Sequence, residues 1–338
     1  MKIARGDDVI PPLAFPATMQ RQKPARLRRG ATIAVVSPAS FAEPFGLGQG
    51  IAFLRKKGYK VVLGECTRKL TRRGMVAASD EMRAKELMDA FKDDKVDAVI
   101  CSRGGYGTMR ILPLLDYDVV RDHPKIFMGY SDITTLHVNF HQKAGLVTFH
   151  GPGVESVGAD VPDSEKGKPD PSKLEKALKL LSSTEPWGEI RNPPEGMLLR
   201  TVRGGKANGL TIGGNLSMMT HTLGSPFEVD TKGRILFFED VHISEYYVEY
   251  ELAAFELAGK LRAAAGIAVG QFSKFAKREE AQPSLEEVLA DHLDRVPVPS
   301  FTGLCVGHGK WNHPVPVGVR ATVDADRPSL TITESALD

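Results

Sequence analysis

The chain has 338 residues, of which 42% are hydrophobic and 25% charged, and this ordinary balance excludes a wholly disordered or fibrous protein. The 44 Lys and Arg residues nearly balance the 42 Asp and Glu residues, so a net charge of +2 gives no electrostatic footprint for nucleic acid or an anionic membrane. At about 100–200 residues per domain, this length favours two domains.

The signals for compartment and membrane are negative. The three cysteines, Cys66, Cys101 and Cys305, are too far apart for a disulfide framework or a CxxC zinc site, which favours a reducing compartment. The first 30 residues lack the continuous apolar run of a secretion signal, and the longest stretch without charged residues, 207–227, is rich in glycine and polar residues. We therefore expect a soluble, cytoplasmic protein.

Strands and helices alternate after a polar N-terminal extension over residues 1–30. Short β-branched or apolar runs predict strands, and capped apolar patterns predict the helices between them. The predicted strands are 32–36, 60–63, 96–101, 125–128 and 146–149, and the predicted helices are 46–57, 79–91, 108–115 and 133–144. This alternation predicts a Rossmann-like α/β domain with a parallel sheet over residues 31–160.

The second half of the chain is organised differently. Residues 161–200 contain several prolines, acids and turn signals, which predict a linker and a long loop. A second domain over residues 201–338 is then expected. Its predicted strands are 203–211, 235–238, 266–271, 300–305 and 317–323, and its predicted helices are 216–223, 246–260 and 284–293.

A candidate nucleophile follows the predicted strand 125–128. The sequence GYSD, with Ser131 and Asp132 as its last two residues, leads directly into a helix. This is the geometry of a nucleophile elbow, which exposes a serine hydroxyl at a helix N-terminus. Ile133 stands where the usual elbow has a second glycine, so the pattern is only half met. The alternative is a simple helix cap, which the local sequence alone favours.

A glycine-rich turn, CSRGGYG, follows the predicted strand 96–101. Its glycines can present backbone N–H groups to an anion, and we expect the N–H of Gly105 to be an oxyanion donor. A phosphate-binding loop is a weaker alternative, because neither GxGxxG nor GxxxxGK[ST] is present. Cys101 is a further candidate nucleophile, although a cysteine that ends an apolar strand is more often a core residue.

A carboxylate and a histidine at strand ends complete the set of candidates. Glu239 and Asp240 follow the apolar strand 235–238, where a carboxylate can orient a histidine or cap a helix. His308 stands between two glycines after the strand 300–305 and suits a general base. A nucleophile, a base, an acid and oxyanion donors together indicate acyl transfer by a serine hydrolase.

The remaining histidines carry weaker signals. His150 and His242 are less favoured candidates for the base. His308 and His313 are poor metal ligands, because the HExxH spacing is absent and Pro314 follows His313. We therefore expect no metal and no cofactor.

Six sequence blocks together resemble the LD-carboxypeptidase family, peptidase family S66. The blocks are SRGGYGTMRILPLLDYD, MGYSDITTLH, FHGPG, GGNLSMMTHTLGSPFE, ILFFEDV and GHG, and their order and spacing match the family over about residues 32–323. The resemblance implies a cytoplasmic homodimer. It also implies an N-terminal α/β domain and a C-terminal, β-rich α/β domain of the swivelling type.

The resemblance assigns roles to particular residues. It implies a Ser-Glu-His triad with Ser131 as nucleophile, Glu239 as orienting acid and His308 as base. The backbone N–H groups of Gly105 and Asp132 would form the oxyanion hole. The first domain would then supply the nucleophile, and the second domain would supply the acid and the base.

The resemblance also implies a substrate class, which is a small peptide. Most of the family hydrolyses an amide between an L-centre and a D-amino acid, releasing terminal D-alanine from the murein tetrapeptide during cell-wall recycling. Arg103 and Tyr106 in the glycine-rich turn are candidate substrate-binding residues. A carboxypeptidase must hold a free carboxylate, and Arg103 is a candidate for that role.

A second substrate class stays open. The microcin C7 immunity branch of the family cleaves a peptidyl-aminoacyl-adenylate and stacks the nucleobase on an aromatic residue. Trp187 is the candidate for that contact, although packing of Trp187 onto the protein body is favoured. The N-terminal extension and the segment HISEYYVEYEL after Glu239 depart from the commoner cell-wall pattern. An alternative of another class is a non-enzymatic protein that binds a small anion at the glycine turn.

Overall fold

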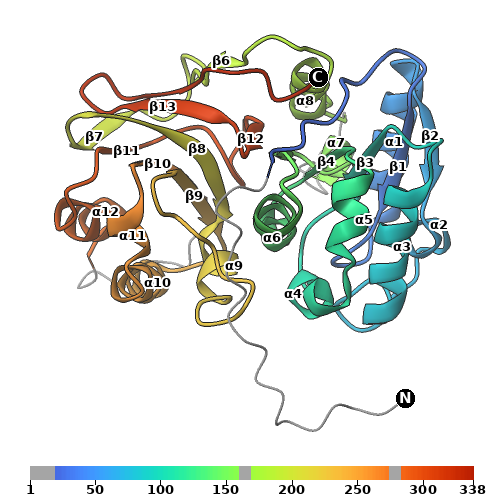
Figure 1. Ribbon diagram of the computed structural model, residues 1–338, viewed down its shortest axis with the longest axis horizontal. Helices are drawn as coiled ribbons and strands as arrows, with labels where there is room; N and C mark the ends of the chain where they lie inside the picture. The colour runs from blue at the N-terminus through green and yellow to red at the C-terminus, as the bar shows by residue number, and fades with distance from the viewer. Residues whose placement is uncertain (1–19, 160–168, 274–282) are drawn as a thin grey trace, which may run out of the picture.

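The computed structural model describes residues 20–159, 169–273 and 283–338, and these form two sheets that lie side by side (Figure 1). Each sheet is covered by its own helices, and α6 (Thr134–Ala144) contacts strands of both sheets. Mixed α/β architecture with an N-terminal parallel-sheet domain and a strand-rich second domain is confirmed. Within the described ranges, no helix has the length and apolar character needed to cross a bilayer.

The first sheet carries the five predicted parallel strands. Its order is β12-β5-β4-β3-β1-β2, with β12 antiparallel at one edge. The strands are β1 (Thr32–Val36), β2 (Lys60–Leu63), β3 (Ala98–Cys101), β4 (Ile126–Gly129), β5 (Thr148–His150) and β12 (Val315–Val317). From β1, the next strand in the chain, β2, lies on one side, and β3 lies on the other, so the strand order switches direction between β1 and β3. Ligands of open α/β sheets bind at such switch points.

Helices cover both faces of the first sheet, as the alternating pattern predicts. One of them, α3, is capped by Ser79, whose hydroxyl accepts a hydrogen bond from the Met82 N–H. Besides α6, the helices are α1 (Pro44–Lys56), α2 (Glu65–Lys69), α3 (Asp80–Lys92), α4 (Thr108–Ile111), α5 (Tyr117–Asp122) and α7 (Ser156–Ala159), with 3-10 turns at Leu112–Leu114 and Ser131–Ile133.

The second sheet has eight strands in the order β6-β14-β13-β8-β9-β10-β11-β7. Its centre, β8 to β11, is parallel, and antiparallel strands flank it on both sides. The strands are β6 (Gly188–Glu189), β7 (Arg200–Arg203), β8 (Lys206–Asn215), β9 (Ile235–Val241), β10 (Gly266–Ser273), β11 (Ser300–Thr302), β13 (Arg320–Asp324) and β14 (Ser329–Ile332). Its helices are α9 (Leu216–Thr220), α10 (Glu245–Leu257), α11 (Lys260–Ala263) and α12 (Leu285–Asp294).

The prediction of one strand over residues 317–323 is wrong. Those residues divide between β12, which pairs with β5 in the first sheet, and β13, which pairs with β8 in the second. Gly318 separates the two strands with a φ of 90°, a left-handed conformation that glycine adopts without strain. The C-terminal segment therefore contributes a strand to each sheet. The alternation of apolar and polar residues in the sequence predicts strands, but it does not show which sheet a strand joins.

The segment expected to be a linker and long loop contains a helix. In its described part, residues 169–200, α8 (Ser172–Leu181) buries an apolar face that includes Leu174, Leu178 and Leu181. Prolines and glycines before and after α8 produce the turn signals that hide this helix in the sequence. The described end of the N-terminal extension also packs on the body: the Leu27 N–H donates to the Leu181 carbonyl at 2.7 Å, and Leu27 is buried.

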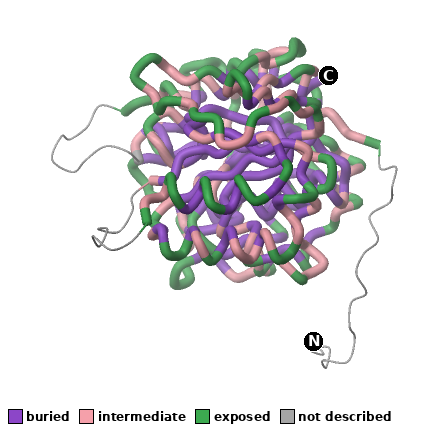
Figure 2. Tube along the Cα trace, turned by 90° about the vertical axis from the view of Figure 1, so that its left-hand side faces the viewer, coloured by how far each residue is buried: buried purple, intermediate pink, exposed green. Residues whose placement is uncertain are grey.

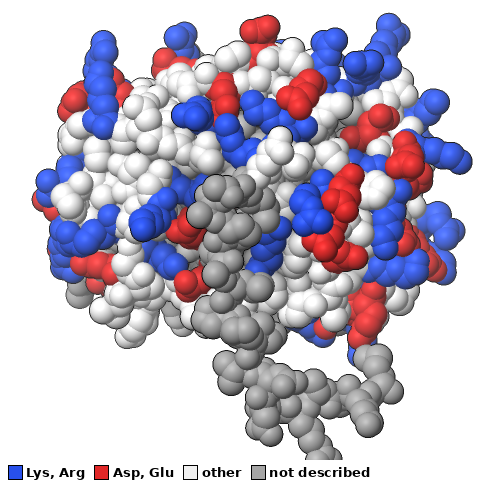
Figure 3. All heavy atoms as spheres, viewed as in Figure 1, with Lys and Arg blue, Asp and Glu red and all other residues white. Residues whose placement is uncertain are grey.

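One hydrophobic cluster runs through both halves of the molecule. It includes Ile33 and Ile100 from the first sheet and Phe237 and Phe301 from the second. Figure 2 shows buried residues along the central strands and exposed residues on the outer turns and helix faces. Over the face in Figure 3, Lys and Arg alternate with Asp and Glu, in keeping with the small net charge.

Candidate functional site

A strained turn presents Ser131 after β4. The backbone of Ser131 has a φ of 65°, in the left-handed region that costs a residue other than glycine roughly 1–2 kcal/mol. A 3-10 turn and then α6 follow at once, so Ser131 lies at the N-terminal end of a helix. This strand–turn–helix geometry is that of a nucleophile elbow, although the second glycine of the usual pattern is missing.

The glycine turn after β3 lies against the Ser131 turn. A Cβ atom on Gly104 would come within 2.8 Å of both the Ser131 Cβ and the Tyr130 carbonyl oxygen, and within 3.2 Å of the Asp132 nitrogen. Only glycine allows this close approach. The next residue, Gly105, is exposed and has a φ of 112°. Two backbone segments that can offer N–H groups to an oxyanion therefore meet at Ser131.

The side chain of Asp132 is committed to holding this arrangement together. Its Oδ2 accepts the Thr108 N–H at 2.9 Å, and the Thr108 hydroxyl donates to the Asp132 carbonyl at 2.6 Å. Burial raises the pKa of the Asp132 carboxyl, against the hydrogen bond from Thr108 that lowers it. Asp132 therefore connects the end of the glycine turn to the start of α6. The backbone nitrogen of Asp132, rather than its side chain, is the part of this residue that faces Gly104.

Glu239 and His308 form a directly hydrogen-bonded pair. Glu239 follows four apolar residues of β9 and is fully buried, and its Oε2 lies 2.6 Å from His308 Nδ1 and accepts the His308 backbone N–H at 3.2 Å. Burial alone would raise the pKa of Glu239, but His308 and His150 together hold it at about 2. A carboxylate bonded to Nδ1 fixes the imidazole so that Nε2 is the nitrogen able to exchange a proton.

A glycine next to His308 makes this pair possible. Gly307 has a φ of 105°, and a Cβ atom there would lie 2.3 Å from Glu239 Oε2. The His308 side chain is 14% exposed, so its outer edge meets solvent. The two halves of the site meet here, because the Tyr130 and His308 rings lie with their centroids 4.9 Å apart.

Hydrogen bonds across the two sheets hold the halves together. The Asn215 N–H, at the end of β8, donates to the Thr134 hydroxyl at the start of α6 at 2.8 Å. Asp240, next to Glu239, accepts from the Asn215 amide at 2.8 Å and from the Ser217 hydroxyl at 2.7 Å. Asp240 therefore organises the loop that starts α9, whereas its neighbour Glu239 holds the histidine.

The other predicted residues take three different positions. Arg103, with a side chain 38% exposed, pairs its Nε with Glu155 Oε1 at 3.1 Å and stays beside the glycine turn. Tyr106 is exposed, and its N–H donates to the Ser40 hydroxyl at 3.1 Å. Trp187 leads into β6 and packs, half-buried, against the main hydrophobic cluster, which favours the packing interpretation of this residue.

The structure argues against a cysteine nucleophile. Cys101 is completely buried at the end of β3, and burial raises the pKa of its thiol well above the usual value. Cys66 and Cys305 are also buried and free. Across the described part of the chain, no three His, Cys, Asp or Glu side chains gather in a way that could hold a metal ion.

Sequence reasoning missed Glu155 and ranked His150 too low. Both belong to the stretch FHGPGVES at the end of β5, which carries His150 and Glu155 past the end of β4. Both are at least nine-tenths buried, and they contact Glu239 and Arg103 respectively. The only sequence signal was a histidine and a glutamate flanking two glycines just after a strand.

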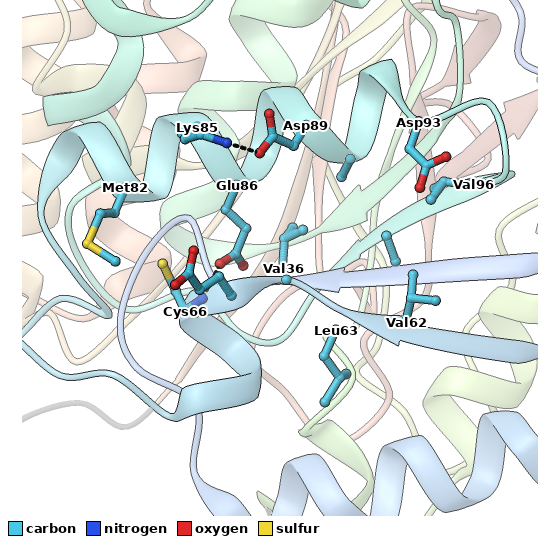
Figure 4. Close-up of a pocket in the computed structure, with 14 residues that line it drawn as sticks. Val36, Val62, Leu63, Cys66, Met82, Lys85, Glu86, Asp89, Asp93 and Val96 are labelled. Atoms are coloured by element: carbon cyan, nitrogen blue, oxygen red, sulfur yellow. Dashed lines mark hydrogen bonds and ion pairs between the residues drawn. The ribbon is translucent and has the colours of Figure 1, made fainter.

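A separate hollow lies at the far edge of the first sheet. It has a volume of about 260 Å³ and lies among β1, β2, α2 and α3 (Figure 4). Glu86 reaches its wall, and there the carboxylate accepts the Ser37 N–H at 2.8 Å, the Cys66 N–H and the Thr67 hydroxyl. Glu86 is therefore a structural anchor for two turns, and none of the predicted catalytic residues lines this hollow.

Comparison with known proteins identifies the family. Residues 33–151 match the family model of the LD-carboxypeptidase N-terminal domain, and residues 208–323 match that of the LD-carboxypeptidase C-terminal domain. A relative named "Probable murein peptide carboxypeptidase", from Bacillus subtilis, is 39% identical over 316 residues, covering 92% of this chain and 94% of the relative. The microcin C7 self-immunity protein MccF of Escherichia coli is 30% identical over 336 residues, covering 93% and 96%.

Solved structures agree with the sequence matches. MccF in complex with glutamyl sulfamoyl guanosine superposes with a TM-score of 0.83 at 26% identity, covering 94% of this chain and 99% of that one. Muramoyltetrapeptide carboxypeptidase from Oxalobacter formigenes superposes with a TM-score of 0.76 at 28% identity, covering 90% and 99%. By sequence and by fold, this chain belongs to the LD-carboxypeptidase family.

Proposed function

We propose that this chain is a serine-type LD-carboxypeptidase with Ser131 as nucleophile, His308 as general base and Glu239 as the acid that orients the base. The observation that carries the proposal is the 2.6 Å hydrogen bond between the buried Glu239 and His308. The strained turn at Ser131 and the contact of the Tyr130 ring with the His308 ring support it from the other side of the site.

The chemistry follows from this arrangement. His308 Nε2 takes the proton of the Ser131 hydroxyl as Ser131 Oγ attacks the carbonyl carbon of the scissile amide. The protonated His308 then passes that proton to the leaving nitrogen as the C–N bond breaks, which leaves an acyl-enzyme. A water molecule, deprotonated by His308, attacks the acyl carbon and restores the serine hydroxyl. Glu239 stays ionised throughout, since His308 and His150 hold its pKa at about 2.

Backbone groups stabilise the tetrahedral intermediates in this proposal. The N–H groups of Gly105 and Asp132 form the oxyanion hole, and the close packing of Gly104 on the Ser131 turn supports their placement. Fixed donors of this kind are worth roughly 10²–10³ in kcat each. Arg103 holds the free carboxylate of the substrate, which is the feature that distinguishes a carboxypeptidase substrate from an internal peptide bond.

The proposed substrate is a murein tetrapeptide, from which the enzyme releases terminal D-alanine in the cytoplasm as cell-wall material is recycled. The 39% identity to a relative named as a murein peptide carboxypeptidase supports this choice. The superposition on a muramoyltetrapeptide carboxypeptidase supports it independently. The homodimer implied by the family resemblance remains part of the proposal.

The decisive experiment replaces the nucleophile. Ser131→Ala is expected to lower D-alanine release from a murein tetrapeptide by on the order of 10³-fold or more, because the oxyanion hole alone retains little activity. Release is measured by coupled detection of free D-alanine, with circular dichroism as the check on folding. Ser183→Ala, in the turn after α8, is the matched control and should behave like the wild type. Undiminished release by a folded Ser131→Ala protein would refute the proposed triad.

A second candidate activity keeps the triad and changes the substrate. The 30% identity to MccF and the superposition on MccF bound to a sulfamoyl nucleoside favour a peptide–nucleotide conjugate. Mass spectrometry of the products from both substrate classes separates the two candidates. Under the conjugate hypothesis, Trp187→Ala impairs cleavage, whereas the half-buried packing of Trp187 favours an effect on stability alone.

A non-enzymatic binding protein is the remaining alternative. It would use the glycine turn to hold a small anion and would leave the hydroxyl of Ser131 unreactive. Labelling of Ser131 by a serine-directed covalent reagent, with protection by the murein tetrapeptide, would exclude this alternative.

A further inference from the structure

His150 occupies an unusual position behind the proposed triad. It is the last residue of β5, and its side chain is fully buried where the first sheet meets β9 of the second. Its ring packs edge-on against Phe237, with centroids 5.5 Å apart, and lies 6.3 Å from the Tyr130 ring. A titratable side chain thus fills the seam between the two sheets within reach of Glu239.

Three buried polar atoms in this seam lack hydrogen-bond partners. Among the residues that the structure describes, neither ring nitrogen of His150 has a partner, nor does Oε1 of Glu239. His150 Nε2 lies 3.8 Å from that same Oε1, which is longer than a hydrogen bond. Orphaned polar atoms in a protein interior are costly, so a cluster of them indicates a functional constraint rather than accidental packing.

The neighbouring histidine shows what a purely structural role looks like. His137 is also fully buried, but its Nε2 lies 2.8 Å from the Gly129 carbonyl oxygen and its Nδ1 lies 2.9 Å from the Thr148 hydroxyl. Both of its nitrogens are therefore used to tie β4 to β5. His137 therefore has no nitrogen left for His150, whereas Glu239 Oε1 lies 3.8 Å from His150 Nε2 and has no hydrogen-bond partner of its own among the described residues.

We propose that His150 is a positioning residue for the reaction, whose Nε2–H donates to Glu239 Oε1 as the site closes around substrate. Oε2 of Glu239 already accepts two bonds from His308, one from Nδ1 and one from the backbone N–H. A donor on Oε1 then fixes the other end of the carboxylate, so that Glu239 cannot rotate about its last bond. This inference rests on the proposed triad and adds a fourth residue to it.

The donation has an electrostatic consequence for the base. A hydrogen bond on Oε1 draws negative charge away from Oε2 and so weakens the hold of Glu239 on the proton of His308. The titratable groups around this pair include His150 from β5, Tyr130 from the turn after β4, and Asp240 beside Glu239 on β9. His137 from α6 lies behind His150, with ring centroids 6.2 Å apart. Asp240 is turned toward Asn215 and Ser217, which leaves His150 as the side chain facing Oε1.

The test compares a variant that lacks the donor with one that keeps it. His150→Phe keeps an aromatic ring against Phe237, although a somewhat larger one, and has no N–H. His150→Gln places an amide N–H near the position of Nε2. We expect His150→Phe to lower kcat by about tenfold, the effect of losing one hydrogen bond, with KM within about twofold of the wild type. His150→Gln should retain kcat within about threefold, since it restores the donor.

The pH profile distinguishes positioning from a structural role. Without the donor, His308 holds its proton more tightly, so the acidic limb of kcat/KM should move to higher pH in His150→Phe by about half a unit and stay in place in His150→Gln. A loss of activity with an unmoved acidic limb, or an equal loss in both variants, would overturn the inference.

Two controls keep this test separate from that of the proposed function. If Ser131→Ala abolishes D-alanine release while His150→Phe leaves kcat and the pH profile unchanged, the triad stands and the role of His150 is wrong. If His150→Phe fails to fold, nitrogen-15 spectra of the wild-type protein with a transition-state analogue decide the matter. An Nε2 of His150 without a proton would then contradict the inference.

Discussion

At the scale of single residues, the site is defined by two local departures from ordinary backbone geometry. Ser131 has a φ of 65°, and Gly307, which directly precedes His308, has a φ of 105°. The strain at Ser131 is retained because Gly104 and the start of α6 enclose the turn. Left-handed geometry at a residue other than glycine is uncommon and recurs at active sites.

The charge on Glu239 gives the first residue-scale prediction. Glu239→Gln preserves the volume, but the neutral amide no longer favours the proton on Nδ1 of His308 or stabilises the imidazolium, so the imidazole takes the wrong tautomer. We expect kcat to fall by roughly 10³–10⁴, as for the corresponding change in other triads. Steady-state kinetics on the tetrapeptide measure the effect. The exposed Glu195→Gln serves as a control and should leave kcat unchanged.

The same carboxylate has a defined pH dependence. The pKa of Glu239 falls from an ordinary value of 4.5 to about 2 on folding, so its ionised form stabilises the folded state above about pH 4.5. That contribution is lost as the pH falls through about 2. The proposed triad therefore assigns any acidic limb of activity above that pH to protonation of His308, because Glu239 is still ionised there. If Glu239→Gln removed the acidic limb of the pH–activity profile, that limb would belong to Glu239, and the assignment to His308 would be wrong.

At the scale of elements, the stretch after β5 braces the glycine turn after β3. Glu155 Oε1 pairs with Arg103, and Oε2 accepts the Glu43 N–H at 2.9 Å at the start of α1. Burial raises the pKa of Glu155 to about 7, despite the nearby Arg103 that lowers it. One buried carboxylate thus connects α1, the glycine turn and the end of β5.

Glu155 gives the element-scale prediction. A carboxyl whose pKa rises on folding binds its proton more tightly in the folded state, so folding becomes less favourable as the pH rises from 4.5 to about 7. Glu155→Gln has no such penalty, so its stability relative to the wild type should increase over this interval. Urea unfolding at pH 5 and pH 8 measures the difference. A constant or decreasing relative stability would show that Glu155 is ionised throughout.

The elements that the sequence predicted best are those with a regular spacing of apolar residues and clear turn or cap residues at both ends. The alternation of strands and helices before residue 150 gives all five parallel strands, and Ser131 lies just after a strand, as predicted. The strand ends predicted beside the other two residues are wrong, because Glu239 lies inside β9, which runs to Val241, and His308 lies six residues beyond β11, which ends at Thr302. Glu155 was missed as a site residue, and His150 was considered only as a less favoured base, because their roles depend on partners far away in the chain. No local pattern encodes the approach of His150 to Glu239 across two sheets.

At the scale of the whole molecule, the chain after His308 crosses from the second sheet to the first and then returns to the second. β12 begins seven residues after this histidine and pairs with β5, with Val315 opposite His150. The chain then turns at Gly318 and enters the second sheet as β13. The position of the proposed base relative to the nucleophile therefore depends on this crossing as well as on the bond to Glu239.

Gly318 provides the test at this scale. A Cβ atom at Gly318 would lie 2.4 Å from Nδ1 of the buried His141, and the φ of 90° disfavours any side chain. Gly233 is a matched control, since its φ is 66° but a Cβ atom there would have no neighbour within 4 Å. We expect Gly233→Ala to cost about 1 kcal/mol from backbone strain alone. Gly318→Ala adds a packing clash and should cost about 2–4 kcal/mol.

The functional consequence separates coupling of the sheets from simple stability. If the crossing sets the distance between base and nucleophile, Gly318→Ala lowers kcat even at temperatures where the protein is fully folded, because relief of the clash with His141 displaces β12 and with it the segment that carries His308. Gly233→Ala, on the turn before β9, should retain the kcat of the wild type. Urea midpoints and kcat measured on the same preparations decide the question. A Gly318→Ala protein that is destabilised by several kcal/mol but has unchanged kcat would show that the bond to Glu239 alone is enough to place His308.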